Sequence, residues 1–157
     1  ADVAQAVAAG RRCLVLSDRV DHVELLADKL IEAGIKAAAL HGQIGKKARA
    51  QIVGDVAAGE IDVTVATGSL IGEGFDCPRL DVLFIATPVS FRGRVTQYIG
   101  RVSRTAPGKT DAIVVDYCDD NRMLWSSYRN RKGVYVAQGC AISTSPAVST
   151  PSQRRAS

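Results

Sequence analysis

The fold is decided by four consecutive apolar residues, Cys13-Leu14-Val15-Leu16, which are followed at once by the polar stretch Ser17-Asp18-Arg19. A short apolar run of this kind predicts a strand that is buried on both of its faces. Such strands are typical of parallel sheets, because the helices that connect parallel strands cover both sides of the sheet. We therefore expect helices and further strands to alternate along the rest of the chain.

Helical and strand-like patterns do alternate around this run. A short alanine-rich helix is expected over residues 1–9, and a longer helix from Asp21 to Gly34, with Asp21 as N-cap and Glu24 completing a capping box. A further helix is predicted from Lys46 to Ala58. The other strands are expected at residues 36–40, 61–66, 82–86 and 112–115. This order predicts an α/β fold, a parallel sheet with helices on both faces in three layers.

The chain is expected to end in a last helix and a polar segment. The helix is predicted to begin at Asp120 or Asn121 and to end before Gly133. Its end carries a basic cluster, Arg129, Arg131 and Lys132. The segment that follows is rich in Ser, Thr and Pro with little to bury, so we expect one domain over residues 1–138 and a flexible tail over residues 139–157.

Composition limits the classes of function. A chain of 157 residues with 46% hydrophobic and 23% charged residues is typical of one soluble domain with a core. The net charge of +4 favours an anionic partner only weakly. No apolar run is long enough to span a bilayer and no signal peptide opens the chain, so we expect no membrane contact. The first residue is Ala1 and the only methionine is Met123, so we expect a piece of a longer protein.

The cysteines predict neither a metal site nor a disulfide framework. The four cysteines are scattered and include no CxxC pair: Cys13, Cys77, Cys118 and Cys140. Most of them lie in or beside apolar runs, which predicts buried thiols in a reducing cytoplasm.

Phosphate chemistry is indicated by a second stretch, Gln97-Tyr98-Ile99-Gly100-Arg101-Val102-Ser103-Arg104. In one helix, Gln97, Arg101 and Arg104 would lie on the same side. The opposite side would bury its apolar residues, Val95, Tyr98, Ile99 and Val102. Two adjacent guanidiniums repel each other unless an anion lies between them, and phosphate matches the arginine fork. The alternative is the solvated face of an ordinary amphipathic helix.

Two apparent nucleotide motifs do not fit their structural context. Gly108-Lys109-Thr110 resembles the end of a P-loop, but Ser103 stands where the first glycine is required, and a strand follows where a helix is needed. Gly72-Glu73-Gly74 resembles the start of a dinucleotide fingerprint, but Cys77 replaces its third glycine. We expect neither motif to bind a nucleotide in the usual way.

Polar and glycine-rich segments follow the predicted strands. Ligands of parallel α/β folds gather at the carboxyl ends of the strands. The segments at that edge are Ser17-Asp18-Arg19, His41-Gly42, Thr67 to Pro78, Thr87-Pro88 and the Asp116 end. This clustering predicts a working edge, although simple loops would also be placed there.

Read together, these segments resemble the motifs of superfamily 2 helicases. Val65-Ala66-Thr67 and Gly72-Glu73-Gly74-Phe75-Asp76-Cys77-Pro78 are similar to motif V, and Gln97-x-x-Gly100-Arg101-x-x-Arg104 is similar to motif VI. Leu14-Val15-Leu16-Ser17 is similar to motif IV, and Leu40-His41-Gly42 also fits. The resemblance covers roughly residues 10–120 in the right order.

The resemblance implies the C-terminal RecA-like domain of an ATP-dependent helicase or translocase. ATP with Mg²⁺ would be shared with a separate N-terminal RecA-like domain that carries the Walker A and B motifs. Arg101 and Arg104 would be arginine fingers, and Gln97 would help to position the γ-phosphate region or couple to the partner domain. Gly74 and Asp76 would approach the nucleotide. Asp76, which precedes a proline, could instead order its own turn.

The resemblance also implies a surface for DNA or RNA. Thr67 would hold a nucleic-acid phosphate, and Ser17, His41 and Gly42 would line the same edge. The spacing in this chain leaves open whether Thr67 or Ser69 makes the phosphate contact. Thr67 could instead merely terminate its strand, and His41 could be a packing histidine.

The chain contains no Walker A lysine and no acidic motif for magnesium, so we do not expect it to hydrolyse ATP alone. Two alternatives stay open. One is a non-catalytic RecA-like domain that binds nucleic acid or protein, and the other is a small-molecule nucleotide enzyme that uses the Gly72–Gly74 turn.

Overall fold

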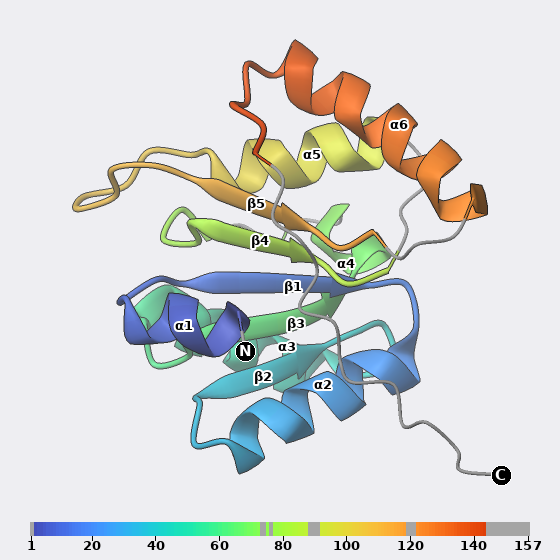
Figure 1. Cartoon of the computed structure of the whole chain (residues 1–157). Coiled ribbons are helices and arrows are strands. Elements are labelled where there is room, and N and C mark those ends of the chain that lie inside the picture. Colours follow the sequence, from blue (N-terminus) through green and yellow to red (C-terminus); the bar gives the residue numbers. More distant parts are fainter. Residues whose placement is uncertain (1, 73–74, 76, 88–91, 119–121, 144–157) are drawn as a thin grey trace, which may run out of the picture.

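Five parallel strands form one sheet in the order β2-β3-β1-β4-β5 (Figure 1). The computed structural model describes residues 2–72, 75, 77–87, 92–118 and 122–143. The strands are β1 (Cys13–Ser17), β2 (Ala37–Leu40), β3 (Val63–Thr67), β4 (Val82–Ile85) and β5 (Ile113–Asp116). Each lies within two residues of its predicted position, and the predicted parallel α/β sheet is confirmed.

Helices cover both faces of this sheet, as predicted. The helices are α1 (Asp2–Ala8), α2 (Val20–Glu32), α3 (Lys46–Ala58), α4 (Gly68–Gly72), α5 (Arg92–Val102) and α6 (Arg122–Ala137). The β1 side chains of Cys13 and Val15 pack in a core with α1 and α2, whereas Leu14 and Leu16 pack in a second core with residues of α3 to α6. Both faces of β1 are covered by helices, which explains why its residues are apolar without alternation.

The predicted capping box at the start of α2 is wrong. α2 begins at Val20, and its N-cap is Arg19, whose side chain makes no capping hydrogen bond. The Asp21 carboxylate lies 2.6 Å from the Arg19 guanidinium, and this hydrogen bond holds the pKa of Asp21 below its usual value. Glu24 lies near His41 instead, with 3.3 Å between Glu24 Oε1 and His41 Nε2. Pairing with other side chains therefore replaces the expected cap.

Two further boundaries differ from the sequence prediction because of buried apolar residues. The glycine-rich turn begins with a short helix, α4, whose Leu70 and Ile71 are buried in the core. α6 does not end before Gly133 but continues to Ala137, since Val134 and Tyr135 hold its last turns on the core. The predicted start of this helix at residues 120–121 lies outside the described residues.

The four cysteines form no disulfide. Cys13 and Cys77 are buried, and Cys118 and Cys140 are partly buried. Burial raises the pKa of the Cys13 thiol to about 12. No helix in the described part of the chain has the length and apolar character needed to cross a membrane. Most of the predicted tail lies outside the described residues, so the boundary at residue 138 stays a prediction.

Candidate functional site

The carboxyl ends of the strands bring several predicted contact residues to one edge. Ser17 and Thr67 are register partners at the ends of β1 and β3, and Leu40 pairs with Ala66, which places His41 beside the same edge. The Asp18 backbone N–H donates to Thr87 Oγ1 at 3.0 Å and so joins the loops after β1 and β4. We call this region the carboxyl edge.

Two predicted contact residues of the carboxyl edge, Ser17 and His41, are buried and contact other side chains of the domain. Ser17 is 1% exposed, and its hydroxyl lies 2.9 Å from His22 Nδ1 and accepts a hydrogen bond from the Arg19 backbone N–H. His41 is 4% exposed, with Nε2 near Glu24 and with Nδ1 buried and without a partner among the described residues. The geometry of His41 therefore favours a packing histidine.

The other two predicted residues of this edge, Gly42 and Thr67, differ in exposure. A Cβ added at Gly42 would meet no atom within 4 Å, and Gly42 is exposed. Thr67 is buried, and its Oγ1 lies 3.5 Å from the hydroxyl of Ser69, which is exposed. Of the two candidates for a phosphate contact, Ser69 thus has the accessible hydroxyl.

The helix α5 carries the motif VI residues away from the carboxyl edge. It runs antiparallel to the strands, so its C-terminal end lies at the amino-end side of the sheet (Figure 1). Its predicted apolar face is confirmed, because Val95, Tyr98, Ile99 and Val102 are buried. Gln97 is exposed and Arg101 is half-buried, and Arg101 forms no ion pair with any residue that the structure describes.

The predicted helical stripe does not reach Arg104. α5 ends at Val102, and Arg104 lies exposed two residues further on, outside the helix. The Val102 carbonyl accepts a hydrogen bond from Lys109 Nζ at 2.5 Å, which satisfies the end of the helix without a further turn. Gln97 and Arg101 therefore share one helix face, whereas Arg104 is held by the loop that follows.

Lys109 also brings the segment after Asp76 to the end of α5. Its ammonium group donates to the carbonyl oxygens of Leu80 at 2.6 Å and Pro78 at 3.2 Å in addition to that of Val102. Burial lowers the pKa of Lys109. Lys109, which resembled a P-loop lysine in the sequence, thus links the end of α5 to the Pro78–Leu80 segment and is followed by β5. Gly74 and Asp76 themselves lie outside the described residues.

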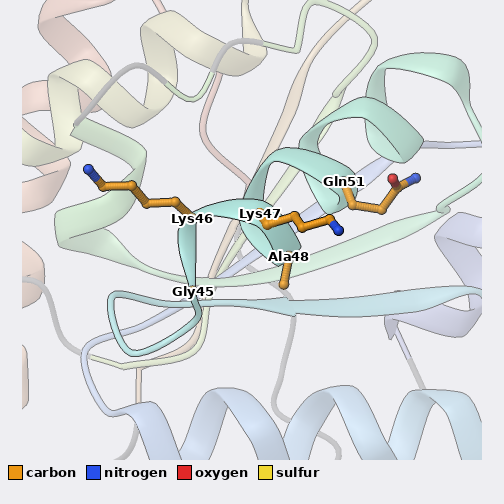
Figure 2. A pocket seen from close by; sticks show the side chains of 5 residues that line it. All are labelled: Gly45, Lys46, Lys47, Ala48 and Gln51. Atoms are coloured by element: carbon orange, nitrogen blue, oxygen red, sulfur yellow. The ribbon is translucent and has the colours of Figure 1, made fainter.

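A basic group at the start of α3 was missed by the sequence analysis. Figure 2 shows the surface formed there by Gly45, Lys46, Lys47, Ala48 and Gln51, with the two lysines pointing in different directions. Arg49 reaches back to the Gly42 carbonyl at 3.4 Å. The signal was available, because three basic residues, Lys46, Lys47 and Arg49, lie within seven residues after Gly42.

A recess of about 450 Å³ lies beside this basic group. Lys46 and Arg49 line it together with apolar residues, Leu40, Ala50, Val53, Leu70 and Phe75. The described residues bring together no group of three or more His, Cys, Asp or Glu side chains that could hold a metal ion.

The parallel sheet and its two edges define a RecA-like α/β domain, and solved structures of this class are similar to it. The C-terminal part of the Fun30 ATPase domain matches with a TM-score of 0.69 at 12% identity, covering 80% of this chain and 41% of that one. The C-terminal domain of S. cerevisiae Dbp5 matches with a TM-score of 0.65 at 18% identity, covering 90% of this chain and 79% of that one. The Pyrococcus furiosus Hef helicase domain matches with a TM-score of 0.59 at 28% identity. The match covers 79% of this chain and 26% of that one.

The chain belongs to the family of the helicase conserved C-terminal domain, whose model matches residues 2–106. This confirms the resemblance to superfamily 2 helicases. UvrABC system protein B from Fervidobacterium nodosum is 32% identical over 148 residues, which cover 85% of this chain and 22% of that protein. A relative from Schizosaccharomyces pombe is named as a putative mitochondrial ATP-dependent helicase, irc3. It is 34% identical over 111 residues, which cover 71% of this chain and 18% of that protein. The chain thus spans about a fifth of these relatives.

Proposed function

We propose that this chain is the C-terminal motor half of an ATP-dependent nucleic-acid helicase or translocase. Its family and the names of its relatives support this proposal. Because the chain spans only about a fifth of those relatives, a separate N-terminal RecA-like domain would supply the Walker A and B motifs and hold ATP with Mg²⁺. The present chain would close over that nucleotide.

The single observation that carries the proposal is the setting of Arg101. The buried face of α5 fixes the helix on the core, and Lys109 fixes the end of α5 against the Pro78–Leu80 segment. Arg101 is left half-buried without an ion pair among the described residues, and a positioned cation of this kind can stabilise the charge on a transferring phosphoryl group. Arg104 in the next loop would be the second finger, with Gln97 on the same helix face as Arg101.

The opposite edge would hold the nucleic acid. Exposed Ser69 and Gly42 lie at the carboxyl edge, and Lys46, Lys47 and Arg49 add positive charge beside it. Such groups bind phosphates without reading sequence, so the proposal covers both DNA and RNA. Ser17, His41 and Thr67 are buried and would support this edge from inside.

The test is ATP hydrolysis by the full-length protein, measured with and without a single-stranded oligonucleotide. We expect Arg101→Ala and Arg104→Ala each to lower turnover by about a thousandfold or more while ATP binding is largely kept. Lys29→Ala is the matched control, because Lys29 is an exposed cation on α2, over the other face of the sheet. Undiminished, nucleic-acid-stimulated hydrolysis in both arginine variants would contradict the finger assignment. A full-length protein that hydrolyses no ATP would favour a non-catalytic binding domain.

A further inference from the structure

The rotation of α6 about its own axis is fixed by a buried polar cluster. Arg131 is 2% exposed, with Nε donating to Asp116 Oδ2 at 2.7 Å and Nη2 donating to Asp116 Oδ1 at 2.9 Å. Arg131 Nη1 also donates to the Ser127 hydroxyl at 2.9 Å, and the Tyr135 hydroxyl donates to Asp116 Oδ2 at 2.6 Å. The predicted basic cluster is therefore divided, because Arg131 points inward and its two basic neighbours do not.

The side of α6 next to this cluster, which begins at the partly buried Tyr128, combines aromatic and basic side chains. Helical spacing places five residues within about 100° of one another, namely Trp125, Tyr128, Arg129, Lys132 and Val136. We call them the α6 stripe. Trp125 is 46% exposed although it is the largest side chain of the helix, and its ring meets that of Tyr128 edge to face at 5.7 Å. An accessible indole held by a second ring is a preformed surface for stacking.

Among the described residues, no acidic side chain compensates the charge of the α6 stripe. The sequence of α6 contains four basic residues, Arg122, Arg129, Arg131 and Lys132, and no Asp or Glu. Asp116 neutralises Arg131, whereas Arg129 and Lys132 are exposed and form no ion pair with any described residue. An interface with protein is normally depleted in lysine at its core, so aromatic rings next to two exposed cations favour a polyanion as the occupant.

We propose that the α6 stripe binds single-stranded nucleic acid, with a base stacked on Trp125 and phosphates held by Arg129 and Lys132. This inference rests on the proposed function and extends its nucleic-acid contact beyond the carboxyl edge. α6 begins shortly after β5 ends, so its N-terminal end lies on the side of the carboxyl edge (Figure 1). Trp125 is in the first turn of α6, so a strand bound at the carboxyl edge would need to reach only this end of the helix.

Trp125 is the only tryptophan of the chain, so its fluorescence reports on the α6 stripe directly. The chain of 157 residues is titrated with an oligothymidylate of about 20 nucleotides at about 50 mM salt. We expect saturable quenching of the tryptophan emission. With a fluorescein-labelled oligothymidylate and anisotropy, Trp125→Ala is expected to weaken binding about five- to 150-fold, and Trp125→Phe much less.

The salt dependence tests the two cations. For a single strand, Arg129→Ala and Lys132→Ala are each expected to reduce the slope of log affinity against log salt by about 0.7, since each removes one phosphate contact. Lys29→Ala on α2 is the matched control and is expected to leave both the slope and the quenching unchanged. A lowered affinity with an unchanged slope would overturn the phosphate contacts.

Three outcomes would overturn the inference. They are oligothymidylate binding without a change in Trp125 emission, an affinity that Trp125→Ala leaves unchanged, and no binding at about 50 mM salt. The first two would indicate that the α6 stripe serves a protein contact or another domain. All three are separable from the proposed function, which depends on ATP hydrolysis by the full-length protein and on Arg101 and Arg104.

Discussion

The hydroxyl of Tyr98 occupies the space that a side chain on Gly68 would need. A Cβ built on Gly68 would lie 2.2 Å from Tyr98 Oη and 3.2 Å from Tyr98 Cζ. Tyr98 comes from the motif VI helix and is completely buried, and Gly68 directly follows Thr67 at the end of β3. Burial raises the pKa of the Tyr98 hydroxyl, and the nearby charge of Asp18 adds to this effect. The two motifs are therefore packed against each other with no atom between them.

This contact predicts a specific coupling between two substitutions. Gly68→Ala is expected to destabilise the protein by about 1–3 kcal/mol in urea unfolding, because the new methyl group collides with the Tyr98 hydroxyl. In a Tyr98→Phe background the oxygen is gone, so the same substitution should cost at least about 1 kcal/mol less. Gly54→Ala is the control, since Gly54 is exposed in the middle of α3 with no atom within 4 Å of its Cβ position. It should stabilise by up to about 1 kcal/mol. Equal costs of Gly68→Ala in both backgrounds would contradict the collision.

Lys109 is expected to matter for folding. Lys109→Met keeps most of the side-chain stem but removes three hydrogen bonds to carbonyl oxygens. We expect a loss of about 1–3 kcal/mol in the free energy of unfolding, measured by urea titration. Lys47→Met at the exposed start of α3 should change stability by less than about 0.5 kcal/mol. Similar effects of the two substitutions would show that the link formed by Lys109 does not stabilise the fold.

The buried pair of Asp116 and Arg131 should be sensitive to the loss of either partner. Although burial opposes the charged form, the hydrogen bonds to Asp116 raise the pKa of Arg131 above its usual value. Arg131→Met leaves Asp116 buried without its cation and is expected to cost about 3–5 kcal/mol in thermal or urea unfolding. Arg131→Lys should recover little, because an ammonium group cannot form the bidentate contact. Arg129→Met on the exposed side of α6 is the control, and a comparable cost there would contradict the assignment.

Tyr135 is expected to make the free energy of unfolding depend on pH in the alkaline range. Burial, together with its hydrogen bond to Asp116, raises the pKa of Tyr135 above the ordinary value of 10.0. The raised pKa stabilises the folded state fully below about pH 10 and progressively less as the pH rises toward the folded-state pKa. The free energy of unfolding should therefore fall by up to about 1.4 kcal/mol per pH unit for this group. Tyr135→Phe should have a shallower decline than wild type above about pH 10, and identical slopes would refute this.

Local patterns were sufficient for the strands and for most helices. The apolar runs of β1 and β4 are buried on both faces, so their periodicity and their environment agree. α3 begins at Lys46 and ends at Ala58 as predicted, because Gly59 adopts a left-handed conformation and stops it. The family was also accessible from sequence, since its motifs are short and contiguous.

Side-chain contacts that the periodic pattern does not contain caused the failures. Arg131 has the sequence context of a solvated cation, and only the fold brings it to Asp116 on β5. The end of α5 depends on Lys109, which lies beyond the helix, so helical spacing alone could not place Arg104 correctly. The Asp21 carboxylate, which the predicted capping box required, instead forms a salt bridge with Arg19. In each case a hydrogen bond or ion pair formed by one side chain replaced the arrangement that the local pattern predicted.

The antiparallel course of α5 gives the domain a mechanical property. Its 11 residues span about 16 Å, and an α-helix of this length resists compression because its backbone hydrogen bonds run along the axis. The Tyr98 hydroxyl lies against Gly68 at the end of β3, and Arg101 lies about one helical turn further along α5, toward the amino-end side of the sheet. In the proposed motor, this one continuous helix would join the nucleotide-binding side of the domain to its nucleic-acid-binding side. A displacement of Arg101 would then be passed along α5 to Tyr98 and the end of β3, because no loop lies between the two residues.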